Sequence, residues 1–347
     1  MTMAKFQRYE RQMALPGIAA AHQDALSRSK ILAVGAGGLG AASLPYLAAA
    51  GIGEIHIADH DTISVTNLHR QTIYQDAQED ENKAECAARY LMALNPDIKA
   101  QAITDKITRD SDLAPYDLIL DGSDNFETKT LLNDISIATQ TPLISASVNQ
   151  FSAQCGIFAG YAHDRPCYSC MFSELPDDAR NCNDAGILGT AAGMAGITQA
   201  HITLQYLMGL HDAQPGLFLT MDYAAMRMQK LKLNKDSACK SCAEQNHSWE
   251  QPMFFQQKTE MISMAELQEK DHIIVDVRND DEVAADPISG NVLHIPLPQL
   301  AGRIDELEAQ DTLLAFVCAG NIRSVKAQEY CAARGMDNLI VLDKFSI

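Results

Sequence analysis

Short apolar runs alternate along this chain with stretches of helical periodicity. The first run, at 31–34, is followed by a glycine-rich turn and a helix of small residues, and the next run ends in Asp59. Apolar runs of this length, bounded by turn residues and separated by helical segments, are typical of strands buried in a parallel sheet. The pattern therefore predicts an α/β fold with a mostly parallel sheet and helices on its faces.

The alternation continues to the end of the chain. Further helices are expected at 83–94, from 126 onward and at 190–208. Further strands are expected at 116–121, 142–147 and 154–161, and the last two complete the sheet. Beyond residue 260, buried strands at 273–278 and 313–317 are expected, the second leading into a loop and a helix, which predicts a small second α/β domain.

The turn after the first strand has the composition of a phosphate-binding loop. Its glycines are Gly35, Gly37, Gly38 and Gly40. Gly35 allows a tight turn, Gly37 lets the backbone approach a phosphate, and Gly40 lets the helix and strand pack closely. Asp59 follows the second strand, where a carboxylate can accept hydrogen bonds from ribose hydroxyls. An ordinary packed turn is the alternative, and the strand before it, the helix after it and the acid favour a nucleotide.

Charged residues follow the ends of the next strands. Arg70 and Lys83 fall where the chain leaves the second strand for the next crossover, on the carboxyl edge of the sheet, where α/β proteins bind ligands. Asp124 stands just past a strand end in the run 121–125, which suits a magnesium ligand beside phosphates. A helix N-cap is the other interpretation of Asp124, and the two roles are compatible.

Length and charge narrow the classes of function. At 347 residues the chain exceeds the roughly 250–300 residues at which single cores stop growing, so we expect two domains, 1–242 and 260–347, with a linker at 243–259. The 45 Asp and Glu against 27 Lys and Arg, a net charge of −18, argue against nucleic acid as a partner. The sequence shows neither a signal peptide nor a membrane span, so we expect a cytoplasmic protein with no membrane partner.

The nine cysteines point to metal and thiol chemistry. Cys167 and Cys170 form one CxxC pair, and Cys239 and Cys242 form another, which together suit a structural zinc site of four thiolates. A redox pair or coincidence is the alternative. Two further cysteines stand apart from these pairs: Cys182 in a polar loop, and Cys318 after a buried strand and before a helix. The position of Cys318 favours a lowered pKa and an anionic persulfide.

With these motifs in place, residues 1–242 resemble the MoeB/ThiF family, relatives of ubiquitin-activating enzymes that adenylate the C-terminal glycine of ubiquitin-like sulfur carrier proteins. The resemblance rests on Arg8-Tyr9-x-Arg11-Gln12, the loop at 35–40, Asn67-Leu68-x-Arg70-Gln71, Lys83, Asp121-x-x-Asp124-Asn125, the paired cysteine motifs and Cys182-x-x-Ala185-Gly186. It implies that Asn67, Arg70 and Lys83 bind the ATP triphosphate, Asp59 the ribose, and Asp124, beside Asn125, Mg2+. It also implies a homodimer in which Arg11 reaches the ATP of the neighbouring subunit, whereas the residues alone indicate a solvated helix face.

Residues 260–347 resemble a rhodanese module, through Asp276-Val277-Arg278 and the loop from Cys318 to Arg323. The usual glycine of that loop is Asn321, and the chain ends at Ile347, where such modules usually continue. The resemblance implies that a Cys318 persulfide turns the acyl-adenylate into a thiocarboxylate, with a cysteine desulfurase as a candidate sulfur donor. Cys182 would then resolve that intermediate or hold the acyl group itself.

Together these observations predict an ATP-dependent adenylyltransferase with sulfur transfer, using ATP, Mg2+ and Zn2+, in molybdopterin, thiamine or tRNA-thiolation pathways. The alternatives are a carrier-binding protein with an inactive tail, an NAD-dependent oxidoreductase built on the same glycine loop, and a tRNA-modifying dehydratase of the same superfamily. The oxidoreductase leaves Arg70, Lys83 and Asp124 without a role, and the dehydratase calls for a basic face that this acidic chain is not expected to have.

Overall fold

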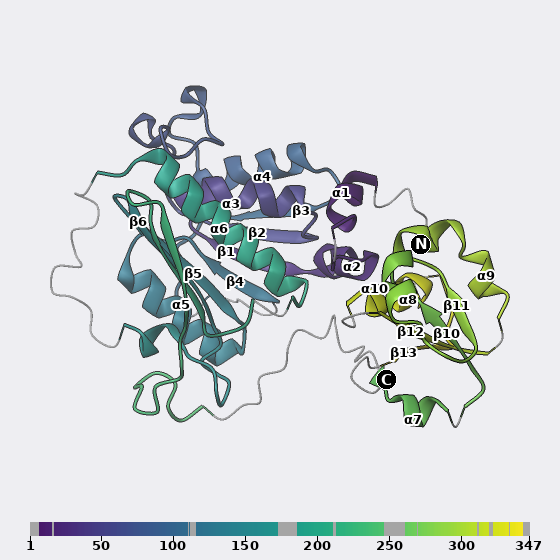
Figure 1. Ribbon diagram of the computed structural model, residues 1–347. Helices are drawn as coiled ribbons and strands as arrows, with labels where there is room; N and C mark the ends of the chain where they lie inside the picture. The colour runs from purple at the N-terminus through teal and green to yellow at the C-terminus, as the bar shows by residue number, and fades with distance from the viewer. Residues whose placement is uncertain are drawn as a thin grey trace. The chain divides into compact units, whose positions relative to one another are not determined.

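Two units, each with its own sheet, make up the chain (Figure 1). The computed structural model describes residues 7–15, 17–109, 111, 116–172, 186–210, 213–245, 261–268, 270–310, 312–318, 322–332 and 334–342. The larger unit comprises Asp24–Phe254, and the smaller comprises Met1–Gln23 with Phe255–Ile347. Most of the linker predicted at 243–259 lies outside the described residues.

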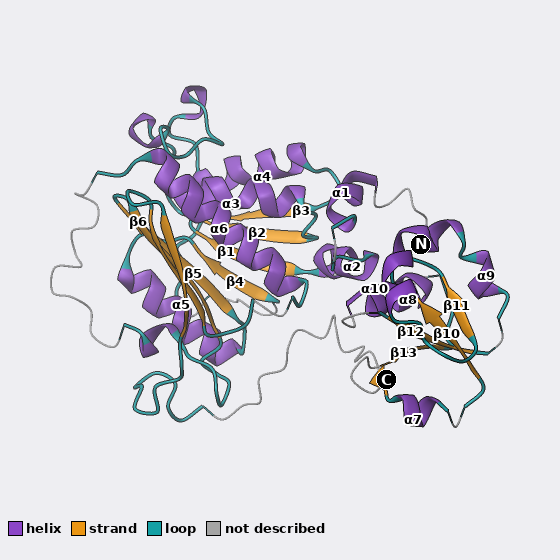
Figure 2. Cartoon of the chain, in the orientation of Figure 1, coloured by secondary structure: helices purple, strands orange, loops and turns teal. Residues whose placement is uncertain are grey.

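The larger unit is built on an eight-stranded sheet with the order β3-β2-β1-β4-β5-β6-β7-β8 (Figure 2). Its strands are β1 Lys30–Val34, β2 Glu54–Ala58, β3 Lys99–Ile103, β4 Leu118–Asp121, β5 Leu143–Asn149, β6 Ser152–Phe158, β7 Leu217–Asp222 and β8 Arg227–Lys232. The first five strands in this order, β3, β2, β1, β4 and β5, pair in parallel with their neighbours. Strands β6, β7 and β8 then follow, each antiparallel to the strand before it. The prediction of a Rossmann-like fold with a mostly parallel sheet is confirmed.

The prediction that the strand at 154–161 completes the sheet is wrong, because β7 and β8 extend it. Every residue of β8 is exposed, and its sequence Arg-Met-Gln-Lys-Leu-Lys lacks an apolar run. An edge strand with both faces open to solvent does not need the apolar pattern by which buried strands are found. Strand β3, at the opposite edge and half exposed, escaped prediction for the same reason.

Helices cover both faces of this sheet. They are α3 Gly38–Ala49, α4 Lys83–Leu94, α5 Phe126–Thr139 and α6 Gly189–Leu207, and a further helix, α2 Ala20–Arg28, precedes β1. Figure 1 shows α3 and α4 on one face and α5 on the other, as right-handed crossovers require on either side of the switch between β1 and β4. Helix α4 has the bounds predicted from the sequence, and the side chain of its N-cap, Asn82, accepts the N–H of Glu85.

The smaller unit has a five-stranded parallel sheet of order β11-β10-β12-β13-β9. Its elements are α1 Glu10–Met13, β9 Met261–Ile262, α7 Met264–Leu267, β10 His272–Asp276, α8 Asp280–Ala285, β11 Val292–His294, α9 Asp305–Glu308, β12 Leu313–Val317, α10 Ile322–Ala332 and β13 Leu339–Leu342. Apolar side chains of β10 and β12, among them Val275 and Phe316, form its core. These are the two strands predicted beyond residue 260.

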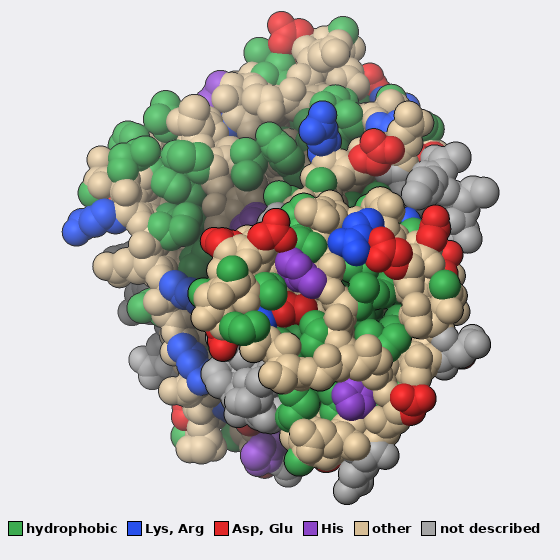
Figure 3. Space-filling model, turned by 45° about the vertical axis from the view of Figure 1, so that its right-hand side comes forward, with side chains coloured by type: hydrophobic (Ala, Val, Ile, Leu, Met, Phe, Trp, Pro, Cys, Tyr) green, Lys and Arg blue, Asp and Glu red, His purple; other side chains and the backbone are tan. Residues whose placement is uncertain are grey.

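The described surface carries charges of both signs. On the face shown in Figure 3, the coloured Lys and Arg side chains are scattered among acidic ones and form no large basic patch. Within the described ranges, none of the helices has the length and apolar character that crossing a bilayer requires.

Candidate functional site

The glycine loop links β1 to α3 at the carboxyl edge of the larger sheet. Gly35 has a φ of +95°, and a Cβ there would lie 2.8 Å from the carbonyl oxygen of Gly122. A Cβ at Gly40 would lie 2.3 Å from the carbonyl oxygen of Gly35. At Gly37, in contrast, a Cβ would have one described atom within 4 Å, Gln71 Nε2 at 3.5 Å, apart from its chain neighbours. The backbone therefore requires glycine at 35 and 40, and Gly37 has room for a ligand.

Asp59 is held against this loop. One carboxylate oxygen accepts the N–H of Ala36 at 2.8 Å, and the other accepts the N–H of Asp61 at 2.9 Å. Burial raises the pKa of the Asp59 carboxyl above its usual value, while these two hydrogen bonds oppose the shift. The acid expected to bind ribose is thus fixed in position at the end of β2.

Lys83 starts helix α4 beside the same strand end. Its side chain is 6% exposed, and its ammonium donates to Asp61 Oδ2 at 3.0 Å. The single O–H proton of Tyr74 is shared between the carbonyl oxygens of Ala36 and Lys83, which lie 2.8 and 3.2 Å from the hydroxyl oxygen. Tyr74 therefore ties the glycine loop to the start of α4, so that the lysine and the loop face one region.

The run 67–71 brings further donors to the loop. Asn67 Oδ1 accepts from Arg70 Nη2 at 2.6 Å, and the Arg70 side chain would lie 3.5 Å from a Cβ at Gly38. Gln71 is 4% exposed, and its Oε1 has no hydrogen-bond partner among the described residues. The buried Oε1 can accept a hydrogen bond from a bound molecule, and Nε2 of the same amide lies beside Gly37. Sequence reasoning gave Gln71 no role, and its place in the 67–71 motif was the only available signal.

The turn after β4 lies against the same loop, since Gly122 is the residue that a Cβ at Gly35 would strike. Asp124 in this turn is exposed, and Asn125 Nδ2 donates to its Oδ1 at 3.3 Å. The side chain of Asn125 accepts the N–H of Thr128 at 2.8 Å and so caps α5. The interpretation of Asp124 as the helix cap is therefore wrong, and its carboxylate is not used by the helix.

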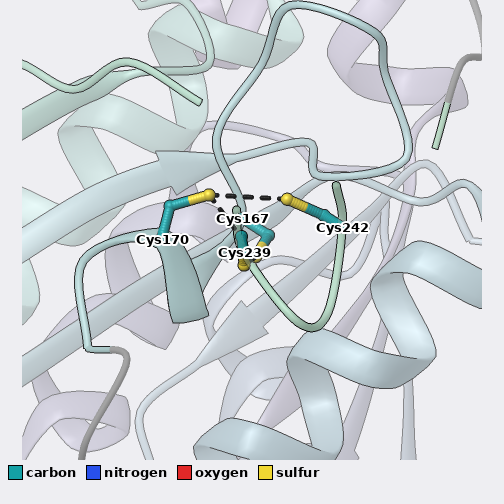
Figure 4. A group of neighbouring side chains, drawn as sticks. All are labelled: Cys167, Cys170, Cys239 and Cys242. Carbon is teal, nitrogen blue, oxygen red and sulfur yellow. Dashed lines mark hydrogen bonds between the residues drawn. The ribbon is translucent and has the colours of Figure 1, made fainter. Parts of the chain in front are cut away.

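The two CxxC motifs meet in space, although Cys239 follows Cys170 by 69 positions in the sequence (Figure 4). The Sγ–Sγ distance is 3.8 Å between Cys167 and Cys170, 3.6 Å between Cys167 and Cys239, and 3.4 Å between Cys170 and Cys242. A tetrahedral zinc ion with Zn–S bonds of about 2.3 Å separates its sulfurs by about 3.8 Å. The four sulfurs and their spacing fit zinc, and none of these cysteines is in a disulfide.

Cys318 follows β12 in the smaller unit and is buried. Its Sγ accepts the N–H of Ser324 at 3.3 Å, from the first turn of α10. Arg323 forms two hydrogen bonds of 2.6 Å with Glu282, and this guanidinium lowers the pKa of Glu282 to about 2. Residues 319–321, which include Asn321, lie outside the described part of the chain.

The structure does not test the placement of two predicted site residues. Arg11 lies in α1, which belongs to the smaller unit, and its role at a neighbouring subunit's ATP stays a prediction. Cys182 lies outside the described residues, as does the rest of its loop at 173–185.

Comparison with known proteins gives concordant results. Among solved structures, Escherichia coli MccB with ATP superposes with a TM-score of 0.60 at 22% identity, covering 68% of this chain and 75% of MccB, which shows a shared fold. The chain is 34% identical to a Thermus thermophilus sulfur carrier protein adenylyltransferase over 252 residues, 70% of this chain and 93% of the relative. It is 32% identical over 333 residues to the adenylyltransferase and sulfurtransferase MOCS3 of Anopheles gambiae, 87% of this chain and 75% of the relative, so the likeness extends into the smaller unit. The ThiF family model matches residues 9–241, and the chain therefore belongs to the ThiF family, as its motifs predicted.

Proposed function

We propose that this protein uses ATP to adenylate the C-terminal carboxylate of a ubiquitin-like sulfur carrier protein. The observation that carries the proposal is the convergence of the glycine loop, the run 67–71 and the Asp124 turn on one edge of the sheet. A relative named sulfur carrier protein adenylyltransferase, which this chain covers almost entirely, supports the choice of substrate.

The chemistry requires that negative charge on the phosphates be neutralised while the carboxylate attacks the α-phosphorus and pyrophosphate leaves. Among the described residues, Asp61 is the acceptor to which Lys83 donates, so two of the three N–H donors of Lys83 are available to phosphate oxygens. The Arg70 side chain lies beside Gly38 of the loop, and Gln71 Nε2 can donate beside Gly37. Mg2+ held by Asp124 would screen the phosphate charge, which is the chemistry that this ion supplies.

We assign Zn2+ to Cys167, Cys170, Cys239 and Cys242 as a structural ion, because all four sulfurs are used and none is left for a substrate. The ion would hold together segments on both sides of the 173–185 loop. Its role in this proposal is to stabilise the fold of the larger unit.

The smaller unit would supply sulfur. A persulfide on Cys318 attacks the carbonyl of the acyl-adenylate, AMP leaves, and an acyl disulfide joins the carrier to Cys318. A second thiol then reduces that disulfide, which releases the carrier thiocarboxylate and leaves Cys318 in a disulfide with the attacking thiol. Cys182 is our candidate for this thiol, and a cysteine desulfurase for the source of the persulfide sulfur. The match to MOCS3, named as a sulfurtransferase, supports this step.

The proposal includes a homodimer in which Arg11 of one subunit reaches the ATP of its partner. A non-catalytic carrier-binding protein remains the rival from another class, and the two differ in whether they exchange pyrophosphate into ATP.

The test is carrier-dependent pyrophosphate exchange into ATP. Asp124→Ala should abolish the exchange and leave thermal unfolding unchanged, because the exposed Asp124 carboxylate makes no helix cap. Asp134→Ala is the matched control: it removes an aspartate from α5 that pairs with the exposed Arg109 and should leave the exchange intact. Full exchange by Asp124→Ala would contradict its assignment as the magnesium ligand. A wild-type protein that binds sulfur carriers without any exchange would favour the carrier-binding protein.

A further inference from the structure

A buried ion pair lies next to the turn that carries Asp124. Asp121, the last residue of β4, is 0% exposed, and Lys129, in the first turns of α5, is 4% exposed. Lys129 Nζ donates to Asp121 Oδ2 at 2.8 Å. Asp124 lies between the two partners in the sequence, so the pair closes the segment that contains it.

Each oxygen of the Asp121 carboxylate has two donors. Oδ1 accepts the backbone N–H and the hydroxyl of Ser123, at 2.9 and 2.6 Å, within the turn itself. Oδ2 accepts from Lys129 and from the hydroxyl of Ser145 on β5, the latter at 2.5 Å. Lys129 also donates to the carbonyl oxygen of Ala146 at 2.7 Å. The pair therefore ties together β4, β5, α5 and the turn.

A further element, α6, completes this arrangement. Gln199 of α6 is fully buried, and its Nε2 donates to the backbone oxygen of Asp121 at 2.7 Å. The free-energy cost of removing two charges from water commonly exceeds the attraction between them. Two apolar side chains at this place would therefore stabilise the fold equally well. The benefit of the ion pair is geometric, because four directed contacts allow the Asp121 carboxylate a single orientation.

We propose that Lys129 is a positioning residue for adenylation: paired with Asp121, it holds the 121–125 turn in the conformation in which Asp124 meets the metal-bound phosphates. The inference rests on the proposed function, in which Asp124 holds Mg2+. A purely structural ion pair would affect stability and leave the magnesium dependence of the reaction unchanged.

The test compares Lys129→Met, Lys129→Arg and a control, Ser136→Ala, in the full chain. Ser136 lies on the same helix, is 2% exposed and donates to the carbonyl oxygen of Thr141 at 2.6 Å, far along α5 from the turn. The measurements are the Mg2+ concentration for half-maximal exchange, the KM for ATP and for the carrier, and thermal unfolding.

Lys129→Met should raise the half-saturating Mg2+ concentration by about tenfold, the lower end of the effect of losing a group that orients a metal ligand, and should leave the KM for the carrier within about twofold. Lys129→Arg should restore most of the magnesium affinity, because a guanidinium can donate to the same carboxylate. Ser136→Ala should unfold at a lower temperature and keep the wild-type magnesium dependence. A folded Lys129→Met with wild-type magnesium dependence would refute the proposal.

If Lys129→Met does not fold, Ser123→Ala tests the proposal in its place. It removes one donor to Asp121 from a partly exposed residue and leaves no buried charge unpaired. The half-saturating Mg2+ concentration should rise about threefold, near the lower end of the range for the loss of one hydrogen bond, because the backbone N–H of Ser123 still donates to the same oxygen. An unchanged value would refute the proposal. Two results separate the two levels: a wild-type protein without exchange would overturn the proposed function, whereas an inactive Asp124→Ala together with wild-type magnesium dependence in the other variants would show that the inference alone is wrong.

Discussion

Replacing Gly196 by alanine should destabilise the larger unit, because α6 packs directly against the backbone of α3 at this position. A Cβ at 196 would lie 2.4 Å from the carbonyl oxygen of Leu39 and 2.8 Å from the Cβ of Ala42. Neither atom can rotate away, since one is backbone and the other is the first atom of a side chain. The two helices would have to separate.

The size of the effect follows from two opposing terms. Overpacking typically costs 1–3 kcal/mol, and we take the upper end, about 3 kcal/mol, because backbone must move. Alanine in a helix interior stabilises the helix by about 1 kcal/mol relative to glycine. The net loss is about 2 kcal/mol, which should lower the melting temperature of a unit of this size by roughly 4–8 °C.

Gly193 on the same helix is the matched control. A Cβ there would find no described atom within 4 Å, so only the helix-propensity term applies. Gly193→Ala should therefore raise the melting temperature by roughly 2–4 °C. Differential scanning calorimetry on the full chain suits the comparison, since the two units can unfold in separate steps. If both substitutions shift the melting temperature in the same direction, the packing argument is wrong.

Two further predictions concern the cysteines. Cys239→Ser should reduce the zinc content of the purified protein from about one ion per chain and lower its melting temperature, because three thiolates hold the ion less well than four; a metal-free protein of full stability would contradict the assignment. Cys318→Ala should leave carrier-dependent pyrophosphate exchange unchanged and stop thiocarboxylate formation, measured by mass spectrometry of the carrier, and undiminished thiocarboxylate would place the sulfur donor outside Cys318.

The features predicted correctly from the sequence are those for which backbone geometry, helix capping or metal coordination requires particular residue types. Gly35 must adopt a positive φ, and Gly40 must admit a carbonyl oxygen where other residues carry a side chain. Their spacing, together with the strand before them, the helix after them and Asp59, indicated the loop. Helix α4 begins after a capping asparagine and ends before Asn95-Pro96, which fixes both bounds. The CxxC pairs were joined correctly because metal chemistry demands four ligands, whatever their separation along the chain.

Other features depend on contacts that no local pattern shows. Strand β8 is exposed along its whole length, and its residues have no apolar pattern to distinguish them from a loop. Gln71 is an ordinary polar residue in the sequence, and only its burial without a partner beside Gly37 makes it a candidate ligand-binding group. The Asp121–Lys129 pair falls in a stretch whose charges suggest a turn followed by a solvated helix, and tertiary packing alone buries it.

Helix α5 shows why such contacts matter for the site. Polar residues four positions apart lie on one face of a helix, and on a solvated helix they have no particular meaning. On α5 they make successive contacts: Asn125 caps the helix, Lys129 pairs with Asp121, and Asn133 accepts the N–H of Tyr168 at 2.8 Å, inside the first CxxC motif. Ile137, four residues further on, packs against the cysteine cluster. One helix thus contacts both the Asp124 turn and the segment that carries the first two cysteines.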